Sequence, residues 1–180
     1  MIILMPREMT WIKGQTDDPN DLCAHGKVQF EINGESLVSV REGEWTVSAT
    51  ALYLLRTLEK DHTKGSPLFE HVFPCCGFSM YDMDGDENVL IIGCPNGIDF
   101  EIRHIDNHVE IKRDGKETSV VTNDAWNRAV INFSEAVNQF YKSSSPKTPH
   151  DEEASKGFAK FRAEWEKRHE IAIQGISLDD

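Results

Sequence analysis

The sequence predicts an α+β fold, with a mostly antiparallel sheet of about five to seven strands built from hairpins and with helices packed mainly on one face. Three observations support this class. Tight-turn pairs such as Asn33-Gly34 separate apolar or alternating runs. Three longer segments carry apolar residues at helical spacing. Strand and helix signals do not alternate along the chain, so a parallel doubly wound sheet is not expected.

The first hairpin is predicted at Lys27–Ile32 and Glu35–Val40. Asn33-Gly34 joins the two strands and is the strongest short hairpin signal that a sequence can carry. The register that follows from a two-residue turn places Phe30 opposite Leu37. One face of this hairpin should therefore be apolar.

The region from 68 to 97 has the most unusual composition of the chain. A strand is predicted at Phe78–Tyr81, and the acidic segment Asp82–Asn88 turns the chain. Val89–Ile92 is a continuous apolar run, which predicts a strand buried on both faces. Cys94–Gly97 indicates a further turn.

The clearest register argument concerns a three-stranded meander over 98–122. If Asp106-Asn107 forms a two-residue loop, one face becomes a ladder of charges and the other an apolar layer. Asp114-Gly115 as a second tight turn then sets Val120 beside Val109. The predicted pairs across the first turn are Glu101–Lys112, Arg103–Glu110, Ile102–Ile111 and His104–Val109.

Helices are predicted over three ranges: 48–60, 124–142 and 151–170. Ser48 is the expected N-cap of the first, and Thr122 or Asn123 that of the second. Gly157 weakens the last helix by about 1 kcal/mol relative to alanine, so packing of its apolar stripe must stabilise it. This stripe consists of Ala154, Phe158, Phe161 and Trp165.

These elements predict one main α+β domain over 1–142. Residues 143–150 have the serine and proline content of a linker. The helix over 151–170 should dock on the same domain, because its three aromatic residues would otherwise expose a large apolar patch. Residues 171–180 form a tail in which Ile171–Ile173 predicts a short strand.

The chain has 180 residues and a formal net charge of −12. This charge argues against nucleic acid and against an anionic membrane surface as partners, because both require a basic face. The apolar start Met1–Met5 is too short for a signal peptide, and we expect a cytoplasmic protein with reduced thiols. An acidic surface attracts basic proteins and speeds their capture, although acidity also serves solubility alone.

Two kinds of metal site have partial support in the sequence. Asp82–Asp86 resembles the start of a calcium loop, but glycine falls at loop position four and glycine again at position twelve, so the EF-hand pattern fails. Zinc could use Cys23, His25, Cys75 and Cys94, whose spacing is irregular. We expect no metal and no cofactor, and buried cysteines that act as small apolar residues.

A thiol enzyme would need a cysteine activated by a nearby histidine. Cys75 or Cys76 with His71 is the candidate set. In an extended segment the adjacent cysteines point to opposite faces, so only one should be able to join a site. A pair formed by His104 and His108 is disfavoured because the meander register puts them on opposite faces.

Two functional hypotheses follow. The first is a non-catalytic acidic binding protein, of the inhibitor or antidote (immunity) type, for a basic protein partner. Its predicted contact residues are Asp82, Asp84, Asp86 and Glu87. The second is a small thiol- or metal-dependent hydrolase centred on the Cys75–Cys94 region. A broad negative surface would favour the first, and a deep pocket holding Cys75 or Cys76 with His71 would favour the second.

Overall fold

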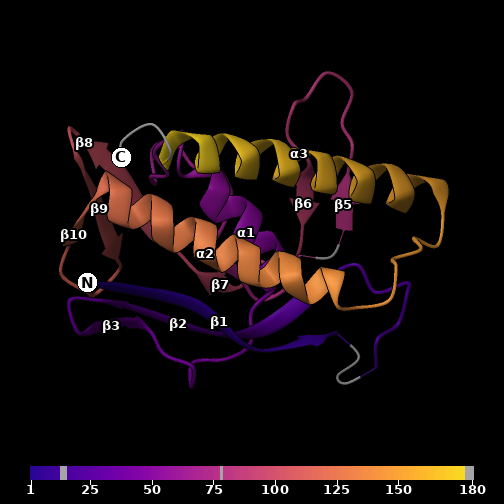
Figure 1. Cartoon of the computed structure of the whole chain (residues 1–180), viewed down its shortest axis with the longest axis horizontal. Coiled ribbons are helices and arrows are strands. Elements are labelled where there is room, and N and C mark those ends of the chain that lie inside the picture. The colour runs from indigo at the N-terminus through magenta and orange to yellow at the C-terminus, as the bar shows by residue number, and fades with distance from the viewer. Residues whose placement is uncertain (13–15, 78, 177–180) are drawn as a thin grey trace.

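The structure is a computed structural model that describes residues 1–12, 16–77 and 79–176, and it confirms the α+β class (Figure 1). The helices are α1 (Val47–Arg56), α2 (Asn123–Lys142) and α3 (Glu152–Ile176). The strands are β1 (Ile2–Trp11), β2 (Ala24–Ile32), β3 (Glu35–Val38), β4 (Phe73–Pro74), β5 (Ser79–Tyr81), β6 (Leu90–Ile92), β7 (Gly97–Ile98), β8 (Phe100–Ile105), β9 (His108–Arg113) and β10 (Ser119–Thr122). In place of one sheet, they form small antiparallel sheets in the orders β1-β2-β3, β10-β9-β8, β4-β7 and β5-β6.

No helix in the part of the chain that the structure describes combines the length and the apolar character needed to cross a membrane.

The first hairpin forms at the predicted turn, but its register differs from the prediction. Ile32 pairs with Glu35, and the ladder then shifts so that Phe30 pairs with Val38 and not with Leu37. The shift is a β-bulge, in which two residues of one strand oppose one residue of the other. Leu37 and Val38 are both fully buried as a result, and β3 ends there instead of continuing to residue 40.

The meander confirms the four predicted pairs between β8 and β9. The third strand is displaced by one residue, because Val121 and not Val120 lies opposite Val109. The turn after Arg113 is therefore longer than the predicted two-residue Asp114-Gly115 loop. A one-residue shift exchanges the two faces of a strand, and Val120 is 47% exposed whereas Val121 is buried.

β4 to β7 form one long hairpin, in which residues 75–77 and 93–96 are not part of a strand. Phe73 and Pro74 pair with Ile98 and Gly97, and Ser79 pairs with Ile92. Residues 75–78 lie between the two sets of pairs on one side of the hairpin, and residues 93–96 lie between them on the other. Because both segments have four residues, the two small sheets share a single register. Phe78, the predicted first residue of β5, lies outside the described residues.

The prediction of a doubly buried strand at Val89–Ile92 is wrong. Among the described residues, the strand β6 pairs with β5 alone, so it belongs to a two-stranded sheet with one sheltered side. Val89 is buried, but Leu90 is 42% exposed and Ile92 is 50% exposed. This apolar edge is available on the surface of the protein.

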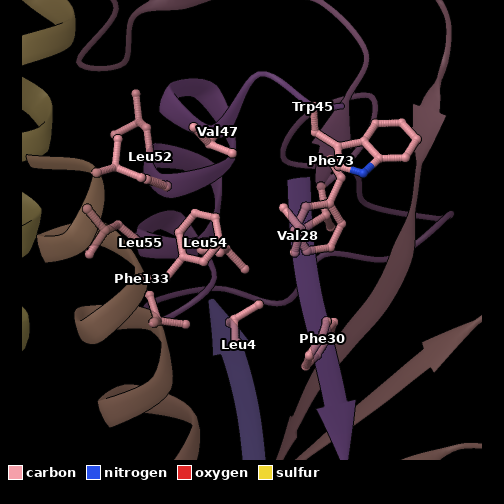
Figure 2. Close-up of a cluster of buried hydrophobic side chains, with 14 of the residues drawn as sticks. Leu4, Val28, Phe30, Trp45, Val47, Leu52, Leu54, Leu55, Phe73 and Phe133 are labelled. Atoms are coloured by element: carbon pink, nitrogen blue, oxygen red, sulfur yellow. The ribbon is translucent and has the colours of Figure 1, made fainter. Parts of the chain in front are cut away.

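The core lies where the β1–β3 sheet meets α1 and α2 (Figure 2). Leu52, Leu54 and Leu55 of α1, Leu4 of β1 and Phe133 of α2 belong to this core, and all five side chains are buried (Figure 2). The aromatic rings of the sheets continue this core, with Phe30 in contact with Phe73, Phe100 and Trp126.

The start of α1 differs from the prediction. Its N-cap is Thr46, and the Ser48 hydroxyl instead donates a hydrogen bond to the Ala24 carbonyl oxygen. The helix ends at Arg56, four residues before the predicted end. The N-cap of α2 is Thr122, one of the two predicted residues, and its side chain accepts a hydrogen bond from the Ala125 amide at 3.2 Å.

The C-terminal helix is longer than predicted, because α3 continues through Ile171–Ile173, where the apolar residues predict a strand. That strand prediction is wrong. The helix packs on β5, α1 and α2, and it buries Phe161 and Trp165 of the predicted stripe. Gly157 lies directly on β5, since a Cβ atom at this position would be 1.8 Å from the Met80 carbonyl oxygen.

Residues 143–150 are bound to the N-terminal part of the chain. The Lys147 ammonium group lies 3.2 Å from the centre of the Trp11 ring and 2.9 Å from Asp17. The Thr148 amide donates to the Pro19 carbonyl oxygen, and the Ser145 amide donates to Asp17. These contacts fix the segment that leads into α3.

A buried ion pair joins α1 to α3. Arg56 donates from Nε and Nη2 to the two carboxylate oxygens of Glu164, at 2.8 and 2.9 Å. The same carboxylate accepts hydrogen bonds from the Val89 amide and from Arg168. Burial opposes ionisation of Glu164, but these donors outweigh it and hold its pKa below the ordinary value.

We predict that Gly157→Ala destabilises the protein by about 1–3 kcal/mol, because the added methyl group would overlap the Met80 carbonyl and push α3 from β5. Helix propensity alone predicts that this substitution stabilises the protein. Gly175 of the same helix has open space where a methyl group would lie, with no atom within 4 Å. Gly175→Ala is therefore the matched control. It should be neutral or stabilise the protein by up to about 1 kcal/mol. Urea unfolding of both variants measures the difference. If Gly157→Ala were as stable as Gly175→Ala, the close contact between Gly157 and the Met80 carbonyl would be contradicted.

We predict that Glu164→Gln lowers the free energy of unfolding by about 3–5 kcal/mol at neutral pH, because it leaves Arg56 as a buried charge without its partner. The control Glu166→Gln removes an exposed carboxylate two residues away. It should change the free energy of unfolding by less than about 0.5 kcal/mol. Urea unfolding of the two variants beside the parent protein measures both values.

The pH dependence gives a second measurement of the same pair. The Glu164 pKa is lower in the folded state than the ordinary value of about 4.3, so its contribution is complete above that pH and is lost as pH falls through the folded-state pKa. Stability of the parent protein should therefore fall more steeply on acidification than that of Glu164→Gln. If the stability of the two proteins fell in parallel as pH is lowered, Glu164 would not be ionised in the folded state.

Candidate functional site

Three cysteines meet at the unpaired middle of the β4–β7 hairpin. Cys75 and Cys76 follow β4, and Cys94 lies on the opposite side, between β6 and β7. The Cys94 amide donates a hydrogen bond to the Cys76 sulfur at 2.7 Å, and the Cys75 amide donates to the Asn96 carbonyl oxygen at 2.9 Å. The pKa values of Cys75 and Cys76 are both affected by hydrogen bonding with the Cys94 side chain. The expectation that only one of the adjacent cysteines could join a site stays a prediction.

Two glycines permit this approach. A Cβ atom at Gly93 would lie 2.0 Å from the Cys76 carbonyl oxygen, and one at Gly97 would lie 2.7 Å from the His71 side chain. The two sides of the hairpin are thus closer than side chains would allow. The backbone of Cys75 is also held from the other side, because the Thr46 hydroxyl donates to its carbonyl oxygen.

The three thiols differ in acidity. Hydrogen bonds from the Cys76 thiol and the Asn96 amide lower the pKa of Cys94 below its ordinary value. Burial and the neighbouring Cys94 raise the pKa values of Cys75 and Cys76. Cys75 is exposed, and Cys76 and Cys94 are partly exposed.

A cavity of about 310 Å³ adjoins the cluster. Cys76, Cys94 and His71 line it on the hairpin side, and Tyr53 and Arg56 of α1 line the other. The Phe69 ring stacks on Tyr53 with centroids 4.4 Å apart and forms part of the same wall. The volume of this cavity is within the range of small-molecule sites.

The structure brings His71 to this cavity but does not join it to a thiol. Among the described residues, no hydrogen bond connects His71 to a cysteine sulfur. Cysteine hydrolases require an imidazole in such contact to accept the thiol proton.

Cys23 and His25, the remaining candidate metal ligands, are engaged elsewhere. Cys23 is buried and donates to the Gly77 carbonyl oxygen, and burial raises its pKa. The two ring nitrogens of His25 bond the Cys23 carbonyl oxygen and the Thr46 hydroxyl. Within the ranges that the structure describes, no group of three or more Cys, His, Asp or Glu side chains is arranged to hold a metal ion.

The second candidate site is the acidic loop between β5 and β6. All residues from 82 to 87 are exposed, and Figure 1 shows this loop extending past α3. Asp82 pairs with Lys160 at 3.2 Å, and Glu87 with Lys167 at 3.8 Å. Lys160 also donates to the Asp86 carbonyl oxygen at 2.7 Å. Sequence reasoning found the carboxylates but missed the lysines of α3, which no local pattern connects to residues some 80 positions earlier.

Comparison of the chain with protein-family models, with curated proteins and with solved structures found no match.

Proposed function

We propose that the protein is a non-catalytic acidic binding protein that holds a basic protein partner at the β5–β6 loop and acts as its inhibitor or antidote, in the manner of an immunity protein. The observation that carries the proposal is the exposure of Asp82, Asp84, Asp86 and Glu87 on one projecting loop. Such a loop can approach a cationic surface before the remainder of the protein does. Opposite charges steer association and raise its rate.

The loop is held in place before any partner binds. Its two ends are paired with Lys160 and Lys167 of α3, so its carboxylates are presented in a defined arrangement. Binding to an ordered loop costs less conformational entropy than binding to a disordered one. The ion pairs leave Asp84 at the tip without a cationic partner among the described residues.

Apolar side chains accompany the charges. Met83 of the loop is 47% exposed, and Leu90 and Ile92 of β6 are exposed beside it. Protein interfaces commonly combine an apolar centre with a polar rim. The β5–β6 hairpin offers both within a few residues of chain.

The charge of the whole protein supports the same proposal. Residues 1–142 contain 23 acidic and 13 basic residues, a net of −10, against the total of −12. The acidic excess thus belongs to the part of the chain that carries the loop. A partner with a basic surface would be attracted over a distance of about one Debye length, roughly 10 Å at 0.1 M salt.

We predict that reversing two loop charges with Asp84→Lys and Asp86→Lys abolishes capture of the basic partner. The immobilised protein is exposed to an extract of its own cells at about 0.05 M and about 0.5 M salt, and retained proteins are identified and tested by direct association kinetics. The matched control is Glu44→Lys with Glu117→Lys, which makes the same charge change at exposed positions outside the loop.

The expected result is a basic protein that the parent and the control retain, that high salt releases and that the loop variant does not retain. Equal loss in the loop variant and in the control would show that net charge and not the loop determines binding. An association rate that is indifferent to salt, or preferential binding to nucleic acid, would overturn the proposal.

A further inference from the structure

The three-thiol cluster is not used by the proposed binding function, yet its arrangement is more specific than the packing of buried cysteines requires. Cys94 lies across the hairpin from Cys75 and Cys76, and the close approach of the two sides requires glycine at residues 93 and 97. The cluster lies at the surface and beside a cavity, whereas Cys23, the remaining cysteine, is 1% exposed. Accessible thiols in mutual contact are the groups that undergo disulfide exchange.

We propose that Cys94 and Cys76 form a thiol–disulfide exchange site for low-molecular-weight disulfides, with Cys94 as the attacking thiol and Cys76 as the resolving thiol.

The reaction has two steps. The Cys94 thiolate attacks one sulfur of the disulfide, so that a bond forms between Cys94 and that sulfur while the original S–S bond breaks and one thiolate leaves. The Cys76 sulfur, having lost its proton to solvent, then attacks Cys94, and the second thiolate leaves. The protein loses two electrons and two protons to give a Cys76–Cys94 disulfide, and the substrate gains them as two thiols.

Two observations support these roles. Cys76 and Cys94 lie in contact across the hairpin, with the Cys94 amide 2.7 Å from the Cys76 sulfur. Hydrogen bonding from Cys76 and from the Asn96 backbone lowers the pKa of Cys94, and thiolate is the reactive form. The sulfur of Cys76 lies 2.7 Å from the Cys94 backbone nitrogen, which places it close to a mixed disulfide formed on Cys94.

The cavity provides the place for the substrate. It adjoins Cys76 and Cys94 but is not lined by Cys75, which points to the first two as the reacting pair. Tyr53, Leu68 and Phe69 give it an apolar wall, and Arg56 and His71 add polar groups. A cavity of about 310 Å³ admits a small disulfide and excludes a folded protein.

The test uses the full-length reduced protein with oxidised glutathione as the probe, followed by mass spectrometry of the intact chain and of peptides. The parent protein should lose two hydrogens without keeping a glutathionyl group, and fragmentation between residues 75 and 76 should place the new disulfide on Cys76 and Cys94. Cys76→Ser should accumulate a mixed disulfide on Cys94. Cys94→Ser should lose both reactions.

Cys75→Ser is the matched control, because it makes the same change one residue from Cys76 on an exposed side chain. It should behave as the parent does. The proposal is overturned if Cys75→Ser is the variant that accumulates the adduct, if Cys94→Ser reacts as fast as the parent, or if the disulfide of the parent protein maps to Cys75. The last measurement needs no variant and therefore decides the pairing even if a substitution prevents folding.

Discussion

The ion pair between Arg56 and Glu164 is the interaction on which the arrangement of the remaining parts depends. Glu164 is 5% exposed and is bonded to α1, to the Val89 backbone and to Arg168 of its own helix. It thereby fixes α3 against α1 and fixes the end of the acidic loop against both. Arg56 also forms a wall of the cavity beside the thiols. A single buried carboxylate thus positions both the acidic loop and the thiol cavity. Breaking a buried pair of this kind is strongly destabilising because it leaves an uncompensated charge, even where the intact pair adds little net stability.

The fold class could be predicted because turns and periodicity are local properties. The β8–β9 register followed from one turn and one pattern of charges, and it is correct in all four pairs. The errors arose at positions whose pairing and burial depend on tertiary contacts. Leu37 enters a bulge because the core accommodates two adjacent apolar side chains, and Val120 faces outward because its turn is longer than two residues. The burial of β6 depends on how many strands flank it, which its own apolar sequence does not specify.

The candidate sites could be predicted only in part. Cysteine and carboxylate positions are visible in the sequence, and composition alone indicates both sites. Regular strand geometry places Cys75 and Cys76 on opposite faces, whereas residues 75–77 and 93–96 of this hairpin are not part of a strand. Gly93 was the available signal, since a glycine within a strand pattern marks close backbone approach. Gly157, which by helix propensity weakens α3, is instead the residue that allows the helix to lie on β5.

The single register that runs through both halves of the β4–β7 hairpin limits how the length of this chain can vary. Residues inserted between 82 and 88 only enlarge a solvent-facing turn and leave every cross-strand pair unchanged. One residue inserted between 93 and 96 would move Gly97 away from His71 and turn Ile98 out of the core, because strand side chains alternate between faces. Homologous chains should therefore differ in length at the loop end of this hairpin and keep a constant spacing between Gly93 and Gly97.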